Sequence, residues 1–322
     1  MAAVLARLRQ RIDPPVATAF AMIVVLLLGG SLYSSNFLSP QYLLQQLQVA
    51  SFLGIIATGT MVVILLGHID LSIPWVVTVG GMMATGATQF LGDSFGVPLA
   101  IPFGIVCGMA IGVVNGLGVA YLRVPSMIFT LGMNAVAQGL MVLHTGGFAP
   151  QDRATETMHF LAVQRTFFGI PNALFVWLAV GLLTVFMLTR TTLGRHIYAI
   201  GNRERAAFLS GVDTRRVLVV CFALSGAGAA LGGVMLAGYA TKSYQAMGDA
   251  YLLPAIAAVV LGGTNILGGR GSYVGTVAGV ILITLLQSIL SVMQMDEAYR
   301  QVIYGTVIIA MLLLYGRERI SR

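Results

Sequence analysis

Charged residues are scarce in this sequence: Asp, Glu, Lys and Arg together make up 9% of its 322 residues. Soluble globular proteins average about 25% charged residues, so a soluble chain of this length could not build a polar surface from so few. Hydrophobic residues make up 57% of the chain, and the mean hydropathy is +0.90. The composition therefore excludes a soluble domain and predicts an all-α integral membrane protein.

Cysteine is almost absent, and so are the common catalytic motifs. Cys107 and Cys221 both lie inside apolar runs without zinc or redox spacing, which favours a packing role. The sequence has no nucleotide-binding loop, no zinc motif and no G-x-S-x-G motif, and its four histidines form no i, i+4 pair. We therefore expect no catalytic residue, no metal and no cofactor on this chain, so that ATP and Mg²⁺, if used, bind a partner subunit.

Long apolar runs are what the sequence has instead. A helix that crosses the hydrocarbon core needs about 20 such residues. Ten runs are candidates: 16–34, 47–66, 73–91, 97–120, 124–144, 170–189, 217–240, 253–268, 272–294 and 301–316. The eighth run is short and rich in glycine, which suggests a broken or re-entrant helix. The first run has no clear small-x-small cleavage site, so we expect it to be retained rather than removed as a signal peptide.

The basic residues fall mainly on one side of these runs. With the N-terminus in the cytoplasm, 14 of the 18 lie in cytoplasmic segments: Arg7, Arg9, Arg11, Arg123, Arg190, Arg195, Arg203, Arg205, Arg215, Arg216, Arg270, Arg317, Arg319 and Arg322. The outer segments hold only Arg153, Arg165, Lys242 and Arg300. This positive-inside asymmetry predicts a bundle of about ten helices with both termini cytoplasmic, and it explains the net charge of +7 without a nucleic-acid partner.

One membrane domain is therefore expected over residues 16–316, between a cytoplasmic N-terminal segment (1–15) and a cytoplasmic C-terminal tail (317–322). Within it, GHIDLSIP (residues 67–74) breaks an apolar run and places Asp70 at the membrane edge. A carboxylate in such a place needs a partner or water. Either the loop lines a cavity or gate, or Asp70 or Ser72 caps the following helix by accepting its N–H groups, and the two roles are compatible.

A polar stripe is expected on the helix that follows Arg123. Thr130, Asn134 and Gln138 recur every four positions and share one helical face, and Asn115 lies in the preceding run. Such a stripe serves either hydrogen bonding between helices or the lining of a polar path, and amide and hydroxyl groups of this kind suit a sugar.

Glycine pairs interrupt the stretch 254–279, where they flank Thr264 and Asn265. Irregular backbone at membrane depth is tolerated only where protein or water covers it. This stretch is similar in pattern to the one around GHIDLSIP. The similarity reflects either an internal repeat or the small residues that membrane helices commonly share. The candidates for a translocation path are Asp70, Asn115, Thr130, Asn134, Gln138, Thr264 and Asn265.

A charged segment, RHIYAIGNRERAAFLSGV (195–212), separates two apolar runs. Gly201-Asn202 predicts a turn, 203–209 a short helix, and Ser210-Gly211 its end. The segment is either a solvated loop whose arginines set orientation and touch anionic lipid, or a helix that fits a groove on a soluble partner.

Four stretches of the sequence, in the same order along the chain, resemble the membrane permease subunit of bacterial ABC importers for sugars, the ribose/xylose/arabinose permease family. They are GHIDLSIP, VNGLGVAYLRVPSMIFTLGM, TTLGRHIYAIGNRERAAFLSGV and AIAAVVLGGTNILGGRGSYVGT, and the resemblance covers about residues 15–316. It implies a multi-pass protein of the bacterial inner membrane that moves a monosaccharide. It also implies three kinds of protein partner: a second permease subunit (identical or different), a cytoplasmic ATP-binding subunit and a periplasmic sugar-binding protein. Membrane lipid is a further expected partner, because of the arginines in the charged segment.

The resemblance assigns the charged segment as well. In the family, the loop after the sixth span, here 190–216, holds a coupling helix that seats in the ATPase. The contact candidates carried over are Gly201, Asn202, Glu204, Ala206, Ala207, Ser210 and Gly211. The chain departs from the family at Ile73-Pro74 and lacks an acidic pair before Ala255, so the sugar stays open. The alternative function is an ion-coupled secondary transporter, which would want more ionisable groups inside the membrane.

Overall fold

The computed structural model describes residues 14–33, 35–296, 298–303, 305–306 and 309. Its elements are α2 (Pro14–Tyr33), η1 (Ser35–Leu38), α3 (Pro40–Leu65), α4 (Ile73–Thr85), α5 (Ala87–Leu122), α6 (Ser126–Thr145), α7 (Glu156–Val163), β1 (Arg165–Phe167), β2 (Ile170–Pro171), α8 (Asn172–Arg190), α9 (Thr192–Leu209), α10 (Thr214–Ala240), η2 (Asp249–Tyr251), α11 (Leu252–Leu261) and α12 (Tyr273–Val292). Apart from the small antiparallel pair β1–β2, the regular elements among the described residues are helices, as expected of an all-α membrane protein.

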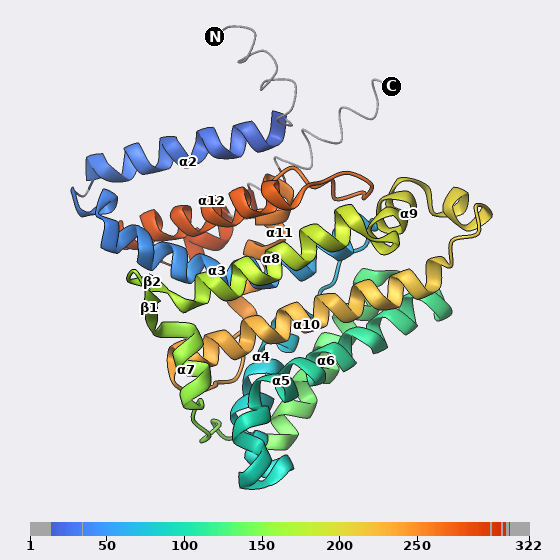
Figure 1. Ribbon diagram of the computed structural model, residues 1–322, viewed down its shortest axis with the longest axis horizontal. Helices are drawn as coiled ribbons and strands as arrows, with labels where there is room; N and C mark the ends of the chain where they lie inside the picture. The colour runs from blue at the N-terminus through green and yellow to red at the C-terminus, as the bar shows by residue number, and fades with distance from the viewer. Residues whose placement is uncertain (1–13, 34, 297, 304, 307–308, 310–322) are drawn as a thin grey trace, which may run out of the picture.

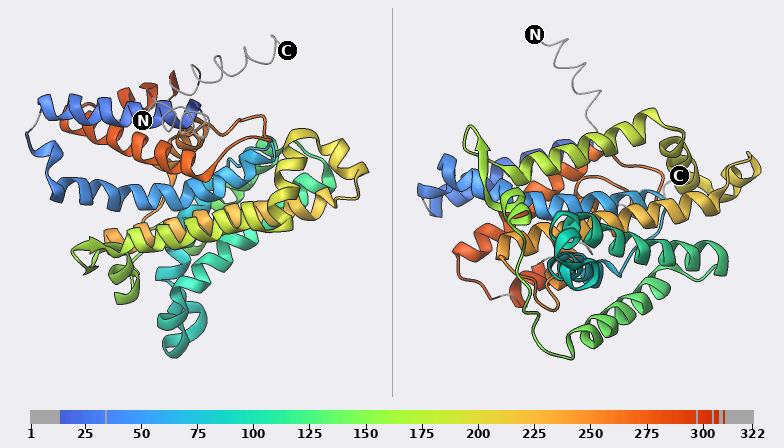
Figure 2. Two further views of the ribbon diagram at one scale, coloured as in Figure 1. Left: turned by 45° about the horizontal axis from the view of Figure 1, so that its top comes forward. Right: turned by 60° about the horizontal axis from the view of Figure 1, so that its bottom comes forward.

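The long helices run roughly alongside one another and give the molecule two distinct ends (Figure 1). The α9 end holds α9, the start of α10 and the connection between α5 and α6. The α7 end holds α7 and the β1–β2 hairpin, and both views in Figure 2 keep the two ends apart. Six helices within the described residues are long and apolar enough to cross a membrane: Pro40–Leu65, Ser94–Leu122, Ser126–Thr145, Asn172–Arg190, Thr214–Ala240 and Tyr273–Val292.

The central helix is α10, which packs against α5, α4 and α3. Small residues allow this packing: a Cβ added at Gly226 would overlap the carbonyl oxygen of Gly108, and one at Gly233 would overlap that of Val77. Close backbone approach of this kind is how membrane helices gain dispersion energy, because lipid supplies no hydrophobic drive between them. Every residue of α4 is buried by these neighbours.

Two expected spans are shorter than the sequence suggested. The run 73–91 is divided between two helices: α4 ends at Thr85, the chain turns at Gly86, and residues 87–91 begin α5, which is itself kinked at Gly92, whose φ is +72°. The run 253–268 ends as a helix at Leu261, before the glycine pairs. At 1.5 Å per residue, the 10 residues of α11 reach about 15 Å, half of the hydrocarbon thickness. The first run forms α2, and most of the run 301–316 lies outside the described residues, as do residues 1–13 and 317–322.

Candidate functional site

The first break in a helix is the loop 66–72 between α3 and α4. Its backbone turns at Gly67, where φ is +83°, and His68 is the last loop residue whose N–H donates back to α3, at the Val63 carbonyl. Three acceptors on α6 take over: Ser126 Oγ binds the Ile69 N–H at 3.3 Å, Thr130 Oγ1 that of Leu71 at 2.9 Å, and Asn134 Oδ1 that of Trp75 at 3.3 Å.

These three α6 residues recur every four positions, so the expected polar stripe bonds to a neighbouring segment at Thr130 and Asn134. Ser126 extends the stripe by one turn and was missed, although its spacing four residues before Thr130 was the available signal. Gln138 continues the stripe in the other direction and is exposed. Buried backbone groups need such partners, because an unpaired one costs about 1–3 kcal/mol.

Asp70 is the centre of a second network and is 2% exposed. Its Oδ1 accepts hydrogen bonds from the Ser72 N–H (3.0 Å) and the Ser72 hydroxyl (2.6 Å), and its Oδ2 accepts one from the Ser225 hydroxyl (2.9 Å). Asn115 Nδ2 donates to Ser72 Oγ at 2.8 Å, while Asn115 Oδ1 has no partner among the described residues. The Asp70 carboxylate is thus held by three hydrogen bonds from uncharged donors.

This geometry corrects the expectation of a helix cap. Ser72 is the residue before α4, yet its side chain makes no capping bond to that helix, and Asp70 bonds to Ser72 itself. Asp70 itself lies away from the α9 end of the protein. Ser225 lies 11 residues into α10, and Asn115 lies seven residues before the end of α5. At 1.5 Å per residue, the carboxylate is therefore roughly 10 to 17 Å inside the α9 end.

The second break is the loop 262–272 between α11 and α12. Gly263, Gly268 and Gly269 have φ of +88°, +87° and +79°, values that favour glycine. Asn265 folds the loop on itself, since its Oδ1 accepts the Leu267 N–H (2.9 Å) and its own N–H donates to the Arg270 carbonyl (2.8 Å). Thr264 is fully buried and its hydroxyl has no partner among the described residues.

The two breaks lie against each other. The Gly269 N–H donates to the Leu65 carbonyl at 2.9 Å, and a Cβ on Gly67 would lie 3.0 Å from the Leu267 carbonyl oxygen. Each break joins one helix to the next through a glycine turn, with a serine just before the second helix: Ser72 before α4 and Ser272 before α12. This shared plan favours the internal-repeat interpretation, as in transporters whose broken helices meet.

α9 contacts the end of α3, where the first break begins, and the loop of the second break. A Cβ on Gly201 would overlap the Leu65 carbonyl oxygen and lie 2.5 Å from the Gly269 nitrogen. The Tyr198 hydroxyl donates to the Gly271 carbonyl at 3.0 Å. Any movement of α9 must therefore displace the ends of α3 and the loop 262–272, because backbone contacts this close cannot slide independently.

The helix is longer than the sequence suggested. It begins at Thr192, where the Thr191 hydroxyl accepts the Gly194 N–H (3.3 Å), and it runs through Gly201 instead of turning there. The break falls at Arg203, whose φ of −156° and ψ of 100° are not helical. The residues after it, 204–209, form the part of α9 nearest the solvent.

Side chains around this kink divide by exposure. Asn202, Glu204, Ala206, Ser210 and Gly211 are exposed, whereas Ala207 is buried in the core and Gly201 is packed as described. Phe208 and Leu209, which the sequence reading passed over, are 64% and 85% exposed. The signal in the sequence was a pair of large apolar residues at the end of an otherwise polar segment. In the structure, Phe208 and Leu209 form an exposed apolar tip at the α9 end.

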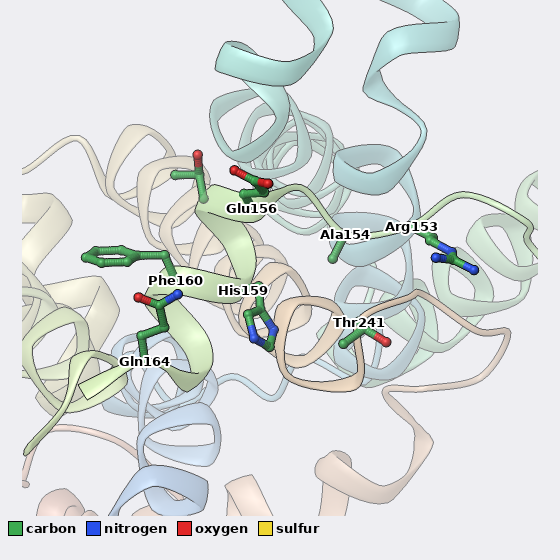
Figure 3. Close-up of a pocket in the computed structure, with 8 residues that line it drawn as sticks. Arg153, Ala154, Glu156, His159, Phe160, Gln164 and Thr241 are labelled. Atoms are coloured by element: carbon green, nitrogen blue, oxygen red, sulfur yellow. The ribbon is translucent and has the colours of Figure 1, made fainter. Parts of the chain in front are cut away.

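The opposite end carries a polar cavity of about 690 Å³ (Figure 3). It lies between α7 and the residues after α10, and its lining includes Arg153, Glu156, Gln164 and Thr241. His159 points from α7 toward α10, where its Nδ1 lies 3.2 Å from the Gly238 carbonyl. Nearby, Asp152 accepts a bond from the Gln89 amide at 2.8 Å. Within the described residues, no group of His, Cys, Asp and Glu could hold a metal.

Between the two ends, the segment 241–251 turns back into the protein. The Gly248 N–H donates to Thr78 Oγ1 at 3.3 Å, and Ser243 bonds to Thr85 at 2.9 Å, so the segment reaches the side of α4. Tyr244 and Asp249 remain exposed on it. A polar, partly exposed segment that dips to the level of a buried half-helix is typical of a transport path.

Comparisons with known proteins agree with this architecture. Residues 42–312 match the family model described as branched-chain amino acid transport system / permease component. The chain is 31% identical over 300 residues to the ribose import permease protein RbsC of Escherichia coli (strain K12), covering 92% of each chain. It is 33% identical over 300 residues to the RbsC of Bacillus subtilis (strain 168), covering 92% of this chain and 91% of the relative.

A third relative is named for a different cargo. The chain is 31% identical over 303 residues to the autoinducer 2 import system permease protein LsrC of Salmonella typhimurium (strain LT2), covering 94% of this chain and 86% of the relative. A comparison with solved structures finds no match. The matches therefore rest on sequence over nearly the whole chain.

Proposed function

The chain belongs to the family of permease components described above, and we propose that it is the membrane-spanning subunit of an ATP-driven importer that moves a monosaccharide into the cell. It is a multi-pass protein of the bacterial inner membrane, and it is a transport subunit, not an enzyme. ATP is hydrolysed on a separate cytoplasmic subunit, and a periplasmic binding protein delivers the sugar. The relatives lend no support to the alternative of an ion-coupled secondary transporter.

The single observation that carries the proposal is the position of α9. One part of it packs against both breaks, through Gly201 and Tyr198. The other part presents Phe208 and Leu209 to solvent. A segment built in this way can pass the movement of a soluble partner to two broken helices in the membrane. Such a transmission is what an ATP-driven importer needs, and it has no use in an ion-coupled transporter.

The substrate is proposed from the relatives. Two of them are named for ribose import and one for autoinducer 2, while the family description names branched-chain amino acids. We give the relatives more weight because they match over 92% of the chain or more. A monosaccharide, with a pentose first, is therefore the primary candidate, and autoinducer 2 is the second.

The proposed topology has about ten spans with both termini in the cytoplasm, so that the α9 end is cytoplasmic and the α7 end faces outward. The distribution of basic residues supports it. Arg123 follows α5, and the arginines from Arg190 to Arg216 lie in or directly beside α9. Arg165 belongs to β1, and Arg153 and Lys242 form an isolated β-bridge near α7. The binding protein would then dock at the α7 end, beside the polar cavity of Figure 3.

The coupling candidates divide into two roles under this proposal. Asn202, Glu204, Ala206, Ser210 and Gly211 would contact the ATP-binding subunit, together with Phe208 and Leu209, because they are exposed. Gly201 and Ala207 would instead hold the coupling segment on the membrane domain, because their surroundings are already filled by this chain.

The path candidates divide in the same way. Asp70, Asn115, Thr130 and Asn134 would fix the first break, since their polar groups bond to its backbone or to one another, and Thr264 and Asn265 would shape the second. The exposed Gln138, Tyr244 and Asp249 would then line the path, which a second permease subunit would complete. Polar groups on an otherwise apolar surface favour such a position over contact with lipid.

The function is tested by reconstitution. The permease is co-expressed with the ATP-binding subunit of its own locus, placed in proteoliposomes, and mixed with the matching binding protein and candidate pentoses, hexoses or autoinducer 2. We expect one of these ligands to stimulate ATP hydrolysis and uptake several-fold. Uptake that follows a proton or sodium gradient, with no ATP-binding subunit in the purified complex, would instead establish the ion-coupled alternative.

The apolar tip provides a sharper test of coupling. Phe208→Glu with Leu209→Glu should reduce the ATP-binding subunit that co-purifies with the permease at least about tenfold, because burying each apolar side chain in a partner contributes roughly 1.5–3 kcal/mol. Affinity-tagged permease and quantitative gels measure the ratio. Phe168→Glu is the matched control, since Phe168 is 99% exposed at the other end of the molecule and should leave the ratio unchanged. Equal ratios in all three proteins would refute a contact at the tip.

A further inference from the structure

A second cavity lies at the α9 end, with a volume of about 570 Å³. Its walls come from four places in the chain: His68 of the first break, the end of α5, the kinked part of α9 and the start of α10. Three arginines line it, Arg123, Arg205 and Arg215. Two further lining residues, Glu204 and Phe208, belong to the proposed contact with the ATP-binding subunit, whereas the function proposed above assigns no role to the three arginines.

The three arginines have no acidic partner. Among the described residues, the one salt bridge within 4.0 Å joins Arg216 to Asp213, which lies outside the lining of this cavity. The single carboxylate of the lining is Glu204. Burial lowers the pKa of the His68 imidazole, and the negative charge of Glu204 acts in the opposite direction. The cavity therefore carries a net charge of about +2 when His68 is neutral, and this charge is not compensated by the protein.

All three arginines are exposed, so a ligand can reach them, and two of them are constrained: Arg123 through its backbone and Arg215 through a neighbouring ring. Arg123 follows α5 in a left-handed conformation, with φ of 54°, and this directs the chain sharply into Pro125 and α6. The guanidinium of Arg215 lies 5.4 Å from the centre of the Tyr121 ring, a cation–π arrangement that positions it without neutralising it. Guanidinium groups are planar forks that match the oxygens of a phosphate, and they need little reorganisation when they are already oriented.

We propose that this cavity binds a phosphate group, carried either by an anionic lipid headgroup or by a soluble phosphate ester. Arg123, Arg205 and Arg215 supply the charge-assisted hydrogen bonds. The apolar part of the wall, which includes Val119, Ala120 and Leu218, covers the carbon portion of the ligand. Because the cavity joins α9 to the first break, an occupied site would hold the coupling segment in its present position.

The test measures both sources with the full-length permease in dodecyl maltoside. Inorganic phosphate is titrated by calorimetry, and retained phosphatidylglycerol is counted by native mass spectrometry after addition of mixed micelles. Arg123→Gln with Arg215→Gln should weaken whichever ligand binds at least about tenfold, the effect expected for two lost charge-assisted bonds. Arg190→Gln with Arg195→Gln removes two arginines at the same end but outside this lining, and should leave binding unchanged.

Each outcome decides the proposal. Phosphate binding that only the first pair of substitutions weakens assigns a soluble ester, and phosphatidylglycerol retention that only this pair weakens assigns a headgroup. Binding of neither ligand by the natural sequence, or equal loss in both variants, overturns the site. Size-exclusion profiles check folding. If the double substitution does not fold, the single substitution Arg205→Gln takes its place.

Discussion

Replacing Asp70 with leucine is expected to lower the thermal unfolding midpoint by about 5 °C or more and to reduce sugar uptake at least about tenfold. The carboxylate accepts three hydrogen bonds in a buried place, two from Ser72 and one from Ser225. Leucine leaves all three donors without an acceptor, and each orphaned donor costs roughly 1 kcal/mol even by the low values measured between membrane helices. Unfolding in detergent and uptake in proteoliposomes give the two readings.

Asp70→Asn is the informative companion. Its amide oxygen can still accept from Ser72, and its amide nitrogen can donate to the Ser225 oxygen, so most of the stability should return. Asp152→Asn is the control for charge alone. Asp152 lies at the α7 end, accepts a hydrogen bond from Gln89 within the described part of the chain, and should change the midpoint by less than about 1 °C when substituted. An Asp70→Leu protein as stable as the natural sequence would show that the network does not hold the first break.

The sequence predicted most of the spans because apolar runs are local signals. It failed where the helix is not lipid-exposed over a full span. α4 is short and wholly buried, so its apolar composition reflects its protein neighbours more than the membrane thickness. α11 is cut off by backbone turns at Gly263 and Gly268, which the glycine pairs suggested without giving the boundary. Composition shows that a segment is apolar, whereas the surrounding helices determine how much of it needs to be helical.

The candidate site was predictable in part for the same reason. The stripe at Thr130 and Asn134 follows from helical spacing, and it was found. Ser225 was not found, because its bond to Asp70 joins residues 155 positions apart. The kink at Arg203 was placed two residues early, since Gly201 looks like a turn and in fact serves a close approach. Glycine permits both uses, and only the neighbouring backbone distinguishes them.

Gly201→Val is expected to separate coupling from docking. A side chain at this position would overlap the Leu65 carbonyl oxygen and crowd the Gly269 nitrogen, so α9 would have to move away from both breaks. The exposed tip at Phe208 and Leu209 would stay intact, and the ATP-binding subunit should still co-purify. Sugar-stimulated ATP hydrolysis and uptake should nevertheless fall at least about tenfold, because a shift of about 1 Å in a packed contact commonly costs factors of this size or more.

The matched control is Gly139→Val on α6, where an added Cβ meets nothing within 4 Å. It introduces the same side chain into a helix at an open position and should leave co-purification and uptake at their original levels. The pattern to look for is therefore a Gly201→Val protein that binds its ATP-binding subunit but does not transport, beside a tip variant that does not bind it at all. If Gly201→Val transports normally, the contact between α9 and the two breaks is not the route by which ATP hydrolysis reaches the membrane helices.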